Sequence, residues 1–161
     1  MSTFERDDFK WRETYFVLFD SCRRPTLKQV ERILHDINSR FELTGGSDDE
    51  DGRFESITVL SSDDYAALDV SYMSGEEVRE QGAQLYAEMK DSAADNDERA
   101  KIARLTKLDA RFDLLHFEQV IGAGEDESEE VLDPSALLVV LEALVELTGG
   151  VGVDPQSGTV L

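Results

Sequence analysis

The sequence predicts an α+β fold with a mainly antiparallel sheet and helices packed on one face, following a ferredoxin-like plan with extra strands. Residues 14–19 and 112–117 are nearly continuous apolar segments, the composition of central strands covered on both faces. Each is followed by a polar loop and a helical pattern, and right-handed strand-helix-strand crossovers would place both helices on one face. Residues 53–60 and 66–73 have the pattern of a hairpin, which favours antiparallel pairing.

Residues 1–13 are polar and mixed in charge, and we expect them to form an arm ahead of a single domain of residues 14–161. A chain of this length can bury a substantial core. The arm has no apolar core of a signal peptide, and no segment has the ~20 apolar residues of a membrane-spanning helix. The single cysteine also excludes an intrachain disulfide. Together, these three features predict a cytoplasmic protein with no membrane partner.

The first helix is predicted over residues 26–38. Thr26 and Gln29 form a capping box, in which the hydroxyl and the amide each satisfy a backbone N–H. Apolar side chains recur at helical spacing on one face: Leu27, Val30, Ile33, Leu34 and Ile37. Phe41 and Leu43 then alternate with charged residues, which indicates a short half-buried strand.

After the hairpin, a capping box of Ser74 and Glu77 predicts a helix that runs to about Lys90. Its apolar stripe is thin. Gly82 lies on this stripe, where it either permits close packing or weakens the helix by ~1 kcal/mol.

The segment up to residue 108 leaves two interpretations open. Asp95 and Glu98 have the spacing of a new helix start, and they follow a stretch of small polar residues. Residues 75–108 therefore form either two helices or one long kinked helix.

Residues 133–161 are the most apolar stretch and begin with another predicted helix. Asp133 is a suitable N-cap, and Pro134 suits the first helical position, where no N–H is needed. Apolar residues occupy almost the whole circumference, and only Glu142 and Glu146 interrupt them, four residues apart. A helix of this kind is normally buried. We expect the helices of residues 75–108 to cover its outer side, with a second copy of the chain as the alternative, so the chain is a monomer or a homodimer.

Gly149-Gly150 is expected to end this helix, and residues 151–153 and 159–161 are expected to form short strands joined by a Pro- and Gly-containing turn. The sequence Leu-Thr-Gly-Gly occurs at residues 43–46 and again at residues 147–150. A duplication of two halves is one explanation, but the first copy follows a predicted strand and the second a predicted helix.

The charge of the chain is its unusual property. There are 36 acidic and 16 basic residues, which gives a net charge of −20. Phosphate binding needs clustered Lys and Arg, so free nucleic acid and anionic membranes are not expected partners. A basic protein partner is compatible with this charge, and so is a simple solubilising role.

The loop of residues 20–26 is the candidate site. It lies between a predicted strand and a capped helix, a position where α/β proteins often place functional residues. Arg23 and Arg24, together with Thr26 and the N–H groups of the helix start, are candidate ligands for a carboxylate or phosphate. Cys22 is a candidate reactive thiol if its pKa is lowered there. Pairing of an arginine with Asp20 is the structural alternative.

Other polar clusters point to structure and not to chemistry. Residues 47–58 fail the EF-hand pattern because Thr58 stands where the bidentate Glu is needed, so we expect a solvated turn. Residues 125–130 are an acidic run of the kind that usually stays solvated. His35 is expected at the surface, and His116 is expected to be a partly buried, hydrogen-bonded residue of a strand. We identify no catalytic residue, metal ligand or cofactor-binding motif.

The leading hypothesis is a non-enzymatic, acidic protein-binding or regulatory module, including the variant of a protein that neutralises a basic or nucleic-acid-directed partner. The alternative is a small-anion-binding or enzymatic domain that uses the 20–26 loop. These two hypotheses can be distinguished by the positions of Arg23 and Arg24. The alternative requires both side chains to converge on a pocket, and it loses its candidate residues if they point separately into solvent.

Overall fold

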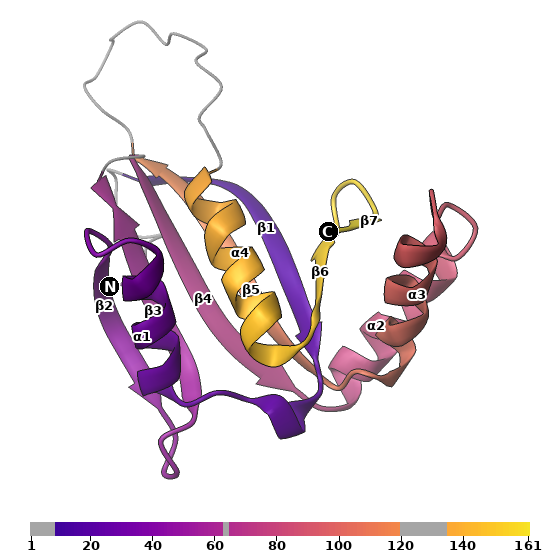
Figure 1. The fold of residues 1–161 in the computed structure, drawn as a ribbon, viewed down its shortest axis with the longest axis horizontal. Coiled ribbons are helices and arrows are strands. Elements are labelled where there is room, and N and C mark those ends of the chain that lie inside the picture. Colours follow the sequence, from indigo (N-terminus) through magenta and orange to yellow (C-terminus); the bar gives the residue numbers. More distant parts are fainter. Residues whose placement is uncertain (1–8, 63–64, 120–134) are drawn as a thin grey trace, which may run out of the picture.

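The computed structural model describes residues 9–62, 65–119 and 135–161 of the chain. Its centre is a seven-stranded antiparallel sheet with the strand order β2-β3-β4-β5-β1-β6-β7 (Figure 1). The strands are β1 (Phe9–Phe19), β2 (Glu42–Asp48), β3 (Phe54–Ser61), β4 (Ala66–Ser74), β5 (Ala110–Gln119), β6 (Val151–Asp154) and β7 (Thr159–Val160). The predicted α+β class with a mainly antiparallel sheet is therefore confirmed.

The described helices follow the sequence patterns closely. They are α1 (Leu27–Ile37), α2 (Glu76–Met89), α3 (Asn96–Arg104) and α4 (Ser135–Thr148), with short 3₁₀ turns η2 (Ser21–Arg23) and η4 (Leu105–Lys107). Two separate helices, and not one kinked helix, thus occupy the segment up to residue 108. The described helices include none that is long and apolar enough to cross a membrane.

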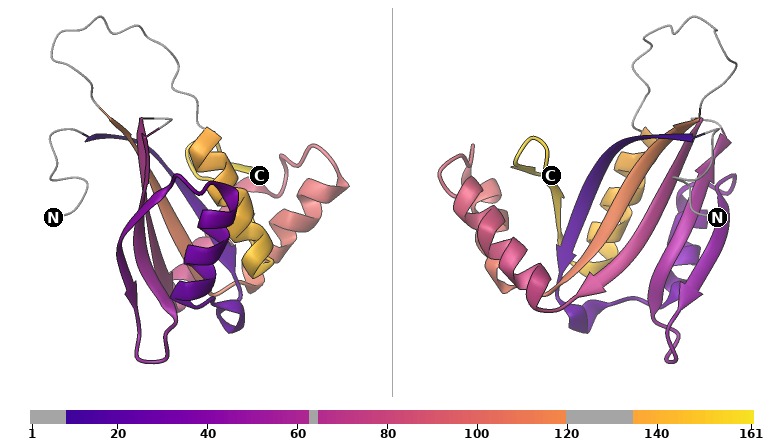
Figure 2. Two further views of the ribbon diagram at one scale, coloured as in Figure 1. Left: turned by 60° about the vertical axis from the view of Figure 1, so that its left-hand side comes forward. Right: turned by 180° about the vertical axis from the view of Figure 1, so that it is seen from behind.

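Two crossover connections explain why α1 and α4 share a face. The unit β1-α1-β2 spans three intervening strands towards one edge, and β5-α4-β6 spans β1 towards the other edge. Since β1 and β5 are antiparallel, crossovers of the same hand that run in opposite directions place their helices on the same side. Figure 2 shows α1 and α4 together on that side. The second unit is the split β-α-β connection of a ferredoxin-like plan.

The core has two parts, on opposite faces of the sheet. Successive residues of β1 belong alternately to one part of the core and to the other, because neighbouring side chains of a strand point to opposite faces. Val17 and Phe19 join the cluster under α1 and α4, which also contains Leu137, Val140 and Leu144 of α4. Leu18 joins the cluster formed with α2, α3, η4 and β6. The helices α2 and α3 therefore do not cover the outer side of α4, contrary to our expectation, because they pack on the other face.

The predicted start of α1 is confirmed, and the predicted start of α2 is wrong. The Thr26 hydroxyl accepts a hydrogen bond from the Gln29 N–H, and the Gln29 side chain accepts one from the Thr26 N–H. At α2 the N-cap is Gly75, with φ +117 and no side-chain cap. Ser74 cannot serve because it still belongs to β4, where it pairs with Ala110.

Helix α3 starts where Asp95 and Glu98 predict. The Asp95 carboxylate accepts a hydrogen bond from the Glu98 N–H at 2.8 Å, and the Glu98 carboxylate accepts one from the Ala94 N–H.

Gly82 of α2 permits close packing, one of its two predicted roles. A Cβ there would lie 2.3 Å from the carbonyl oxygen of Leu105, so α2 contacts η4 through a position that only glycine can occupy.

Helix α4 ends at Thr148, the following Gly149 has φ +66, and the Gly150 N–H donates to the Val145 carbonyl at 3.2 Å. This is the Schellman pattern, which satisfies carbonyls left free at a helix end. The first Gly of the other Leu-Thr-Gly-Gly copy, Gly45, has a similar φ of +63 but lies within β2. The caps predicted at Asp133 and Pro134 lie outside the described residues.

Strand β1 begins at Phe9, earlier than predicted. Residues 9–13, which were expected in the arm, pair with β5, with a register shift between Trp11 and Glu13. The remaining arm residues lie outside the described part of the chain.

Candidate functional site

The 20–26 loop is held to the sheet by the carboxylate of Asp109, a residue far away in the sequence. The Asp109 side chain accepts two hydrogen bonds from Ser21, one from its N–H and one from its hydroxyl, each at 2.8 Å. The Asp20 carboxylate accepts a bond from the Cys22 N–H and so caps η2. The loop is therefore ordered by Asp109 and by its own Asp20, without any ligand.

The Arg24 side chain is occupied by contacts within the protein. Its Nε and Nη2 donate to the Phe54 carbonyl at 3.0 and 2.8 Å, and its Nη1 lies 3.2 Å from the Asp49 carboxylate. Its guanidinium also stacks 3.9 Å from the ring centroid of Tyr72. With 15% of the side chain exposed, Arg24 joins the loop to β3 and β4 and has few donors left for a ligand.

Thr26 is occupied as well, because its hydroxyl caps α1 and its backbone forms a bridge with Arg53. Of the predicted anion ligands, only Arg23 is exposed, and its side chain forms no hydrogen bond or ion pair with any described residue, although its backbone N–H donates to the Asp20 carbonyl. The 20–26 loop therefore does not bring its two arginines together around one ligand.

Arg23 instead lies beside the end of α4. Its Nη2 would be 3.7 Å from a Cβ placed on Gly149, and Arg104 Nη2 donates to the Gly149 carbonyl at 2.5 Å. Positive charge at a helix C-terminus interacts favourably with the carbonyl dipoles, so both arginines stabilise this end. Sequence reasoning missed Arg104. Its position in the last turn of α3 carries no signal that it reaches α4.

Cys22 is exposed, as a reactive thiol requires, but its electrostatic environment opposes reactivity. A hydrogen bond to the Asp20 carboxylate, followed by the negative charge of the same group, raises the pKa of Cys22. A raised pKa lowers the fraction of thiolate at neutral pH, and the thiolate is the nucleophile. The direction is opposite to the one expected for a reactive cysteine.

The two histidines differ in their surroundings. His35 is exposed on α1, as predicted. His116 is buried, with 3% of its surface exposed, on β5 opposite Glu13. Its Nδ1 lies 3.2 Å from Glu13 Oε1, within ion-pair distance, yet the orientation does not make a hydrogen bond. The predicted burial is confirmed, whereas the predicted hydrogen bond is not formed at Nδ1.

The acidic turn after β2 is used for local structure. Asp49 Oδ1 accepts hydrogen bonds from the N–H groups of Asp51 and Arg53, each at 2.9 Å, and the bond from Arg53 is the main cause of a lowered pKa of Asp49. Within residues 9–62, 65–119 and 135–161, no three His, Cys, Asp or Glu side chains are placed to hold a metal ion. Residues 125–130 lie outside the described part.

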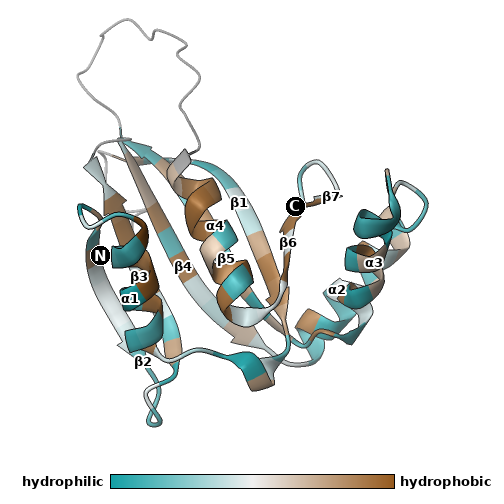
Figure 3. Cartoon of the chain, viewed as in Figure 1, coloured by the Kyte–Doolittle hydropathy of each residue, from teal (hydrophilic) through white to brown (hydrophobic). Residues whose placement is uncertain are grey.

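The outer face of α4 is the most distinctive described surface. Leu138 and Val139 are 42% and 39% exposed, although Leu137, Val140 and Leu144 on the inner face are fully buried or nearly so. Glu142 and Glu146 follow at helical spacing on the same outer face and are exposed. Figure 3 shows α4 as a largely hydrophobic helix lying across the front of the sheet. We call Leu138, Val139, Glu142 and Glu146 the α4 surface.

Comparisons with known proteins do not assign a function to either region. No protein-family model, curated protein or solved structure matches this chain.

Proposed function

We propose that this protein is a non-enzymatic binding module that acts in the cytoplasm, and that its α4 surface binds a basic amphipathic segment of a partner protein. The single observation that carries the proposal is the exposure of Leu138 and Val139 on a helix whose other apolar residues are buried or partly buried. Two neighbouring large apolar side chains in water are an unused source of binding free energy, about 25 cal/mol for each Å² that a partner covers.

Charge selects the chemistry of the partner. Glu142 and Glu146 continue the outer face of α4, and the whole chain carries a net charge of −20. A partner with apolar side chains flanked by Lys or Arg would cover Leu138 and Val139 and neutralise the two carboxylates.

A second copy of the chain fits this surface less well. In a symmetric dimer the same patch meets itself, so Glu142 and Glu146 of both copies would come together. The net negative charge of each copy adds to this repulsion. The electrostatics thus favour a different, basic protein over self-association.

The test uses a synthetic amphipathic helical peptide with a leucine face flanked by lysines, and its binding is followed by fluorescence anisotropy. We expect saturable binding that weakens at high ionic strength, because salt screens exposed charges. Replacing Leu138 and Val139 by Ser should weaken binding about tenfold, the effect of losing ~1.4 kcal/mol of apolar contact. Glu142→Gln combined with Glu146→Gln should weaken it several-fold and reduce the salt dependence.

The controls match each change at another exposed place. Leu161→Ser removes an apolar side chain that is 44% exposed, and Glu77→Gln with Glu80→Gln removes two exposed carboxylates from α2. Equal effects of the control and α4 variants would contradict the proposal, as would a peptide with glutamates in place of lysines that binds equally well. A dimer in sedimentation that the Leu138 and Val139 changes dissociate would assign the surface to a second copy.

A second candidate function is the binding of a small anion by Arg23 and Arg104. The observation that favours it is that both guanidinium groups lie near Gly149, while the Arg23 side chain makes no hydrogen bond or ion pair with described residues. Titration with inorganic phosphate and with acetate tests this candidate. Loss of a saturable response in Arg23→Ala with Arg104→Ala would support it, and the absence of any response in the wild type would contradict it.

A further inference from the structure

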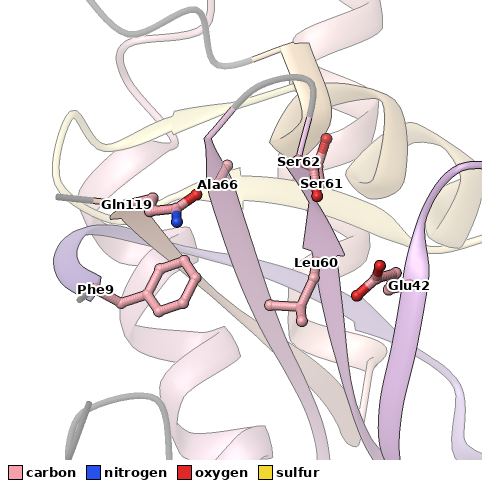
Figure 4. A pocket seen from close by; sticks show the side chains of 7 residues that line it. All are labelled: Phe9, Glu42, Leu60, Ser61, Ser62, Ala66 and Gln119. Atoms are coloured by element: carbon pink, nitrogen blue, oxygen red, sulfur yellow. The ribbon is translucent and has the colours of Figure 1, made fainter. Parts of the chain in front are cut away.

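A small pocket opens at the end of the sheet where β1 begins and β5 ends (Figure 4). Its volume is about 130 Å³, and five strands contribute to its lining, either directly or through the residue that follows them. The lining residues are Phe9, Glu42, Leu60, Ser61, Ser62, Ala66 and Gln119. Strand pairing brings them together, since Phe9 lies opposite Gln119, Leu60 opposite Glu42, and Ser61 opposite Ala66.

The size of the pocket limits what it can hold. Sites for drug-sized molecules and cofactors have volumes of about 300–1,000 Å³, so a nucleotide or an extended cofactor does not fit. A single short side chain or a small organic molecule does.

The lining combines an apolar floor with acceptors at the edge. Leu60 lies between the ring of Phe9 and the carboxylate of Glu42 in Figure 4. Ser62 and Gln119 add a hydroxyl and an amide oxygen, both able to accept hydrogen bonds. Lys and Arg do not occur among the lining residues, so no cation of the pocket itself neutralises Glu42.

The carboxylate of Glu42 is the distinctive group. It is exposed and forms no ion pair or hydrogen bond with the residues that the structure describes. Several other acidic groups of the sheet and its turns are paired, as Asp49 is with Arg24 and Glu118 is with Arg12. An unpaired carboxylate beside apolar side chains is suited to a cation that carries an apolar stem.

We propose that this pocket binds an alkylammonium group, with the ammonium at Glu42 and the aliphatic stem over Leu60 towards Phe9. An ammonium has three N–H donors, and the two oxygens of the Glu42 carboxylate can accept from it. Gln119 lies at the opposite end of the pocket, beside Phe9, where the stem points (Figure 4). The net charge of −20 raises the local concentration of cations and disfavours an anionic ligand at the same place. Both a free amine and a lysine side chain of a peptide have this chemistry.

The experiment is an NMR titration of the isotope-labelled full chain, read at the backbone amides of Leu60, Ala66 and Gln119. The probes are n-butylammonium, a lysine blocked at both backbone ends, and n-butanol as a neutral molecule of similar shape. We expect saturable shifts at these amides with at least one of the two ammonium compounds, and binding of n-butanol several-fold weaker. Preference for the free or the blocked compound identifies the source of the group.

Variants keep the test specific. Glu42→Gln should weaken ammonium binding by about three- to fivefold, the range of an exposed ion pair, while leaving n-butanol unchanged. Glu80→Gln removes an exposed carboxylate from α2 and should change neither. No saturable shift with either ammonium compound, equal binding of n-butanol, or no effect of Glu42→Gln would each overturn the proposal. None of the lining residues belongs to the α4 surface, so the result is independent of the proposed function.

Discussion

Ser21 and Asp109, which are 88 positions apart in the sequence, are joined by two hydrogen bonds of 2.8 Å. The two bonds connect the residues just after the end of β1 with the residue just before the start of β5, its neighbouring strand. Burial alone would raise the pKa of Asp109, but the bonds from the Ser21 N–H and hydroxyl outweigh it, so that the pKa lies below its usual value of 3.8. The ionised carboxylate is therefore part of what orders the 20–26 loop.

This pair predicts a pH-dependent contribution to stability. A carboxyl whose pKa is lowered in the folded state stabilises the protein above its unfolded pKa and loses that contribution as pH falls through the folded pKa. Ser21→Ala should cost ~1 kcal/mol at pH 7, the net contribution of one hydrogen bond, and less at a pH below 3.8. Urea unfolding of wild type and variant at both pH values measures the difference.

The matched control for this prediction is Ser92→Ala. The Ser92 hydroxyl donates to the Met89 carbonyl at 2.9 Å, an acceptor that does not titrate. Its effect on the free energy of unfolding should be the same at both pH values. An equally constant effect of Ser21→Ala would contradict the role of the ionised Asp109.

Gly82 predicts a large effect of a single methyl group. An alanine Cβ would lie 2.3 Å from the Leu105 carbonyl oxygen, which belongs to the backbone and cannot rotate away. Overpacking typically costs 1–3 kcal/mol, and so short a contact with a backbone atom should outweigh the ~1 kcal/mol gain in helix propensity. We expect Gly82→Ala to reduce the free energy of unfolding by ~1–2 kcal/mol in chemical denaturation.

Ala83→Gly is the reference for helix propensity, because Ala83 is exposed in the same turn of α2. It should destabilise by ~1 kcal/mol without any change in packing. If Gly82→Ala were instead more stable than wild type, the close contact between α2 and η4 would not exist.

Arg24 and Arg23 are adjacent but should differ strongly when replaced. Arg24→Ala removes two hydrogen bonds to the Phe54 carbonyl, the ion pair with Asp49 and the contact with the Tyr72 ring. A bond to a charged group contributes about 1.5–3 kcal/mol, so we expect a loss of ~3 kcal/mol. Arg23→Ala, at an exposed position, should change stability by less than ~0.5 kcal/mol. Equal effects in thermal and urea unfolding would refute the distinction.

Most elements were predictable because their signals are local. The caps at Thr26 and Asp95 were recognised correctly, since a capping side chain bonds to a backbone N–H a few residues away. Ser74 has the same local signal but is a strand residue, because pairing with Ala110 extends β4 by one position. Propensity and capping patterns yield to such tertiary pairing.

The candidate site was less predictable, since it depends on partners far away in the sequence. Nothing in the pair Arg23-Arg24 indicates which one lies under Phe54 and Tyr72, and Arg104 has no local sign of its contact with Gly149. The strand order, which decides these contacts, is set by crossovers that the sequence does not encode locally. The nearly complete apolar circumference of α4 predicted burial, but it did not reveal that the other helices would leave Leu138 exposed.

Cys22 provides a prediction in which two neighbouring changes act in opposite directions. The pKa of its thiol is raised first by hydrogen bonding to Asp20 and then by the charge of that carboxylate, whereas the positive charge of Arg53 lowers it. Asp20→Asn keeps an acceptor for the Cys22 N–H but removes the charge, so alkylation by iodoacetamide near neutral pH should become several-fold faster. Arg53→Gln should make it slower. The pH at which the alkylation rate reaches half its maximum should move down in the first variant and up in the second. A rate that is unchanged in both variants, while circular dichroism shows that both are folded, would mean that Asp20 and Arg53 do not control this thiol.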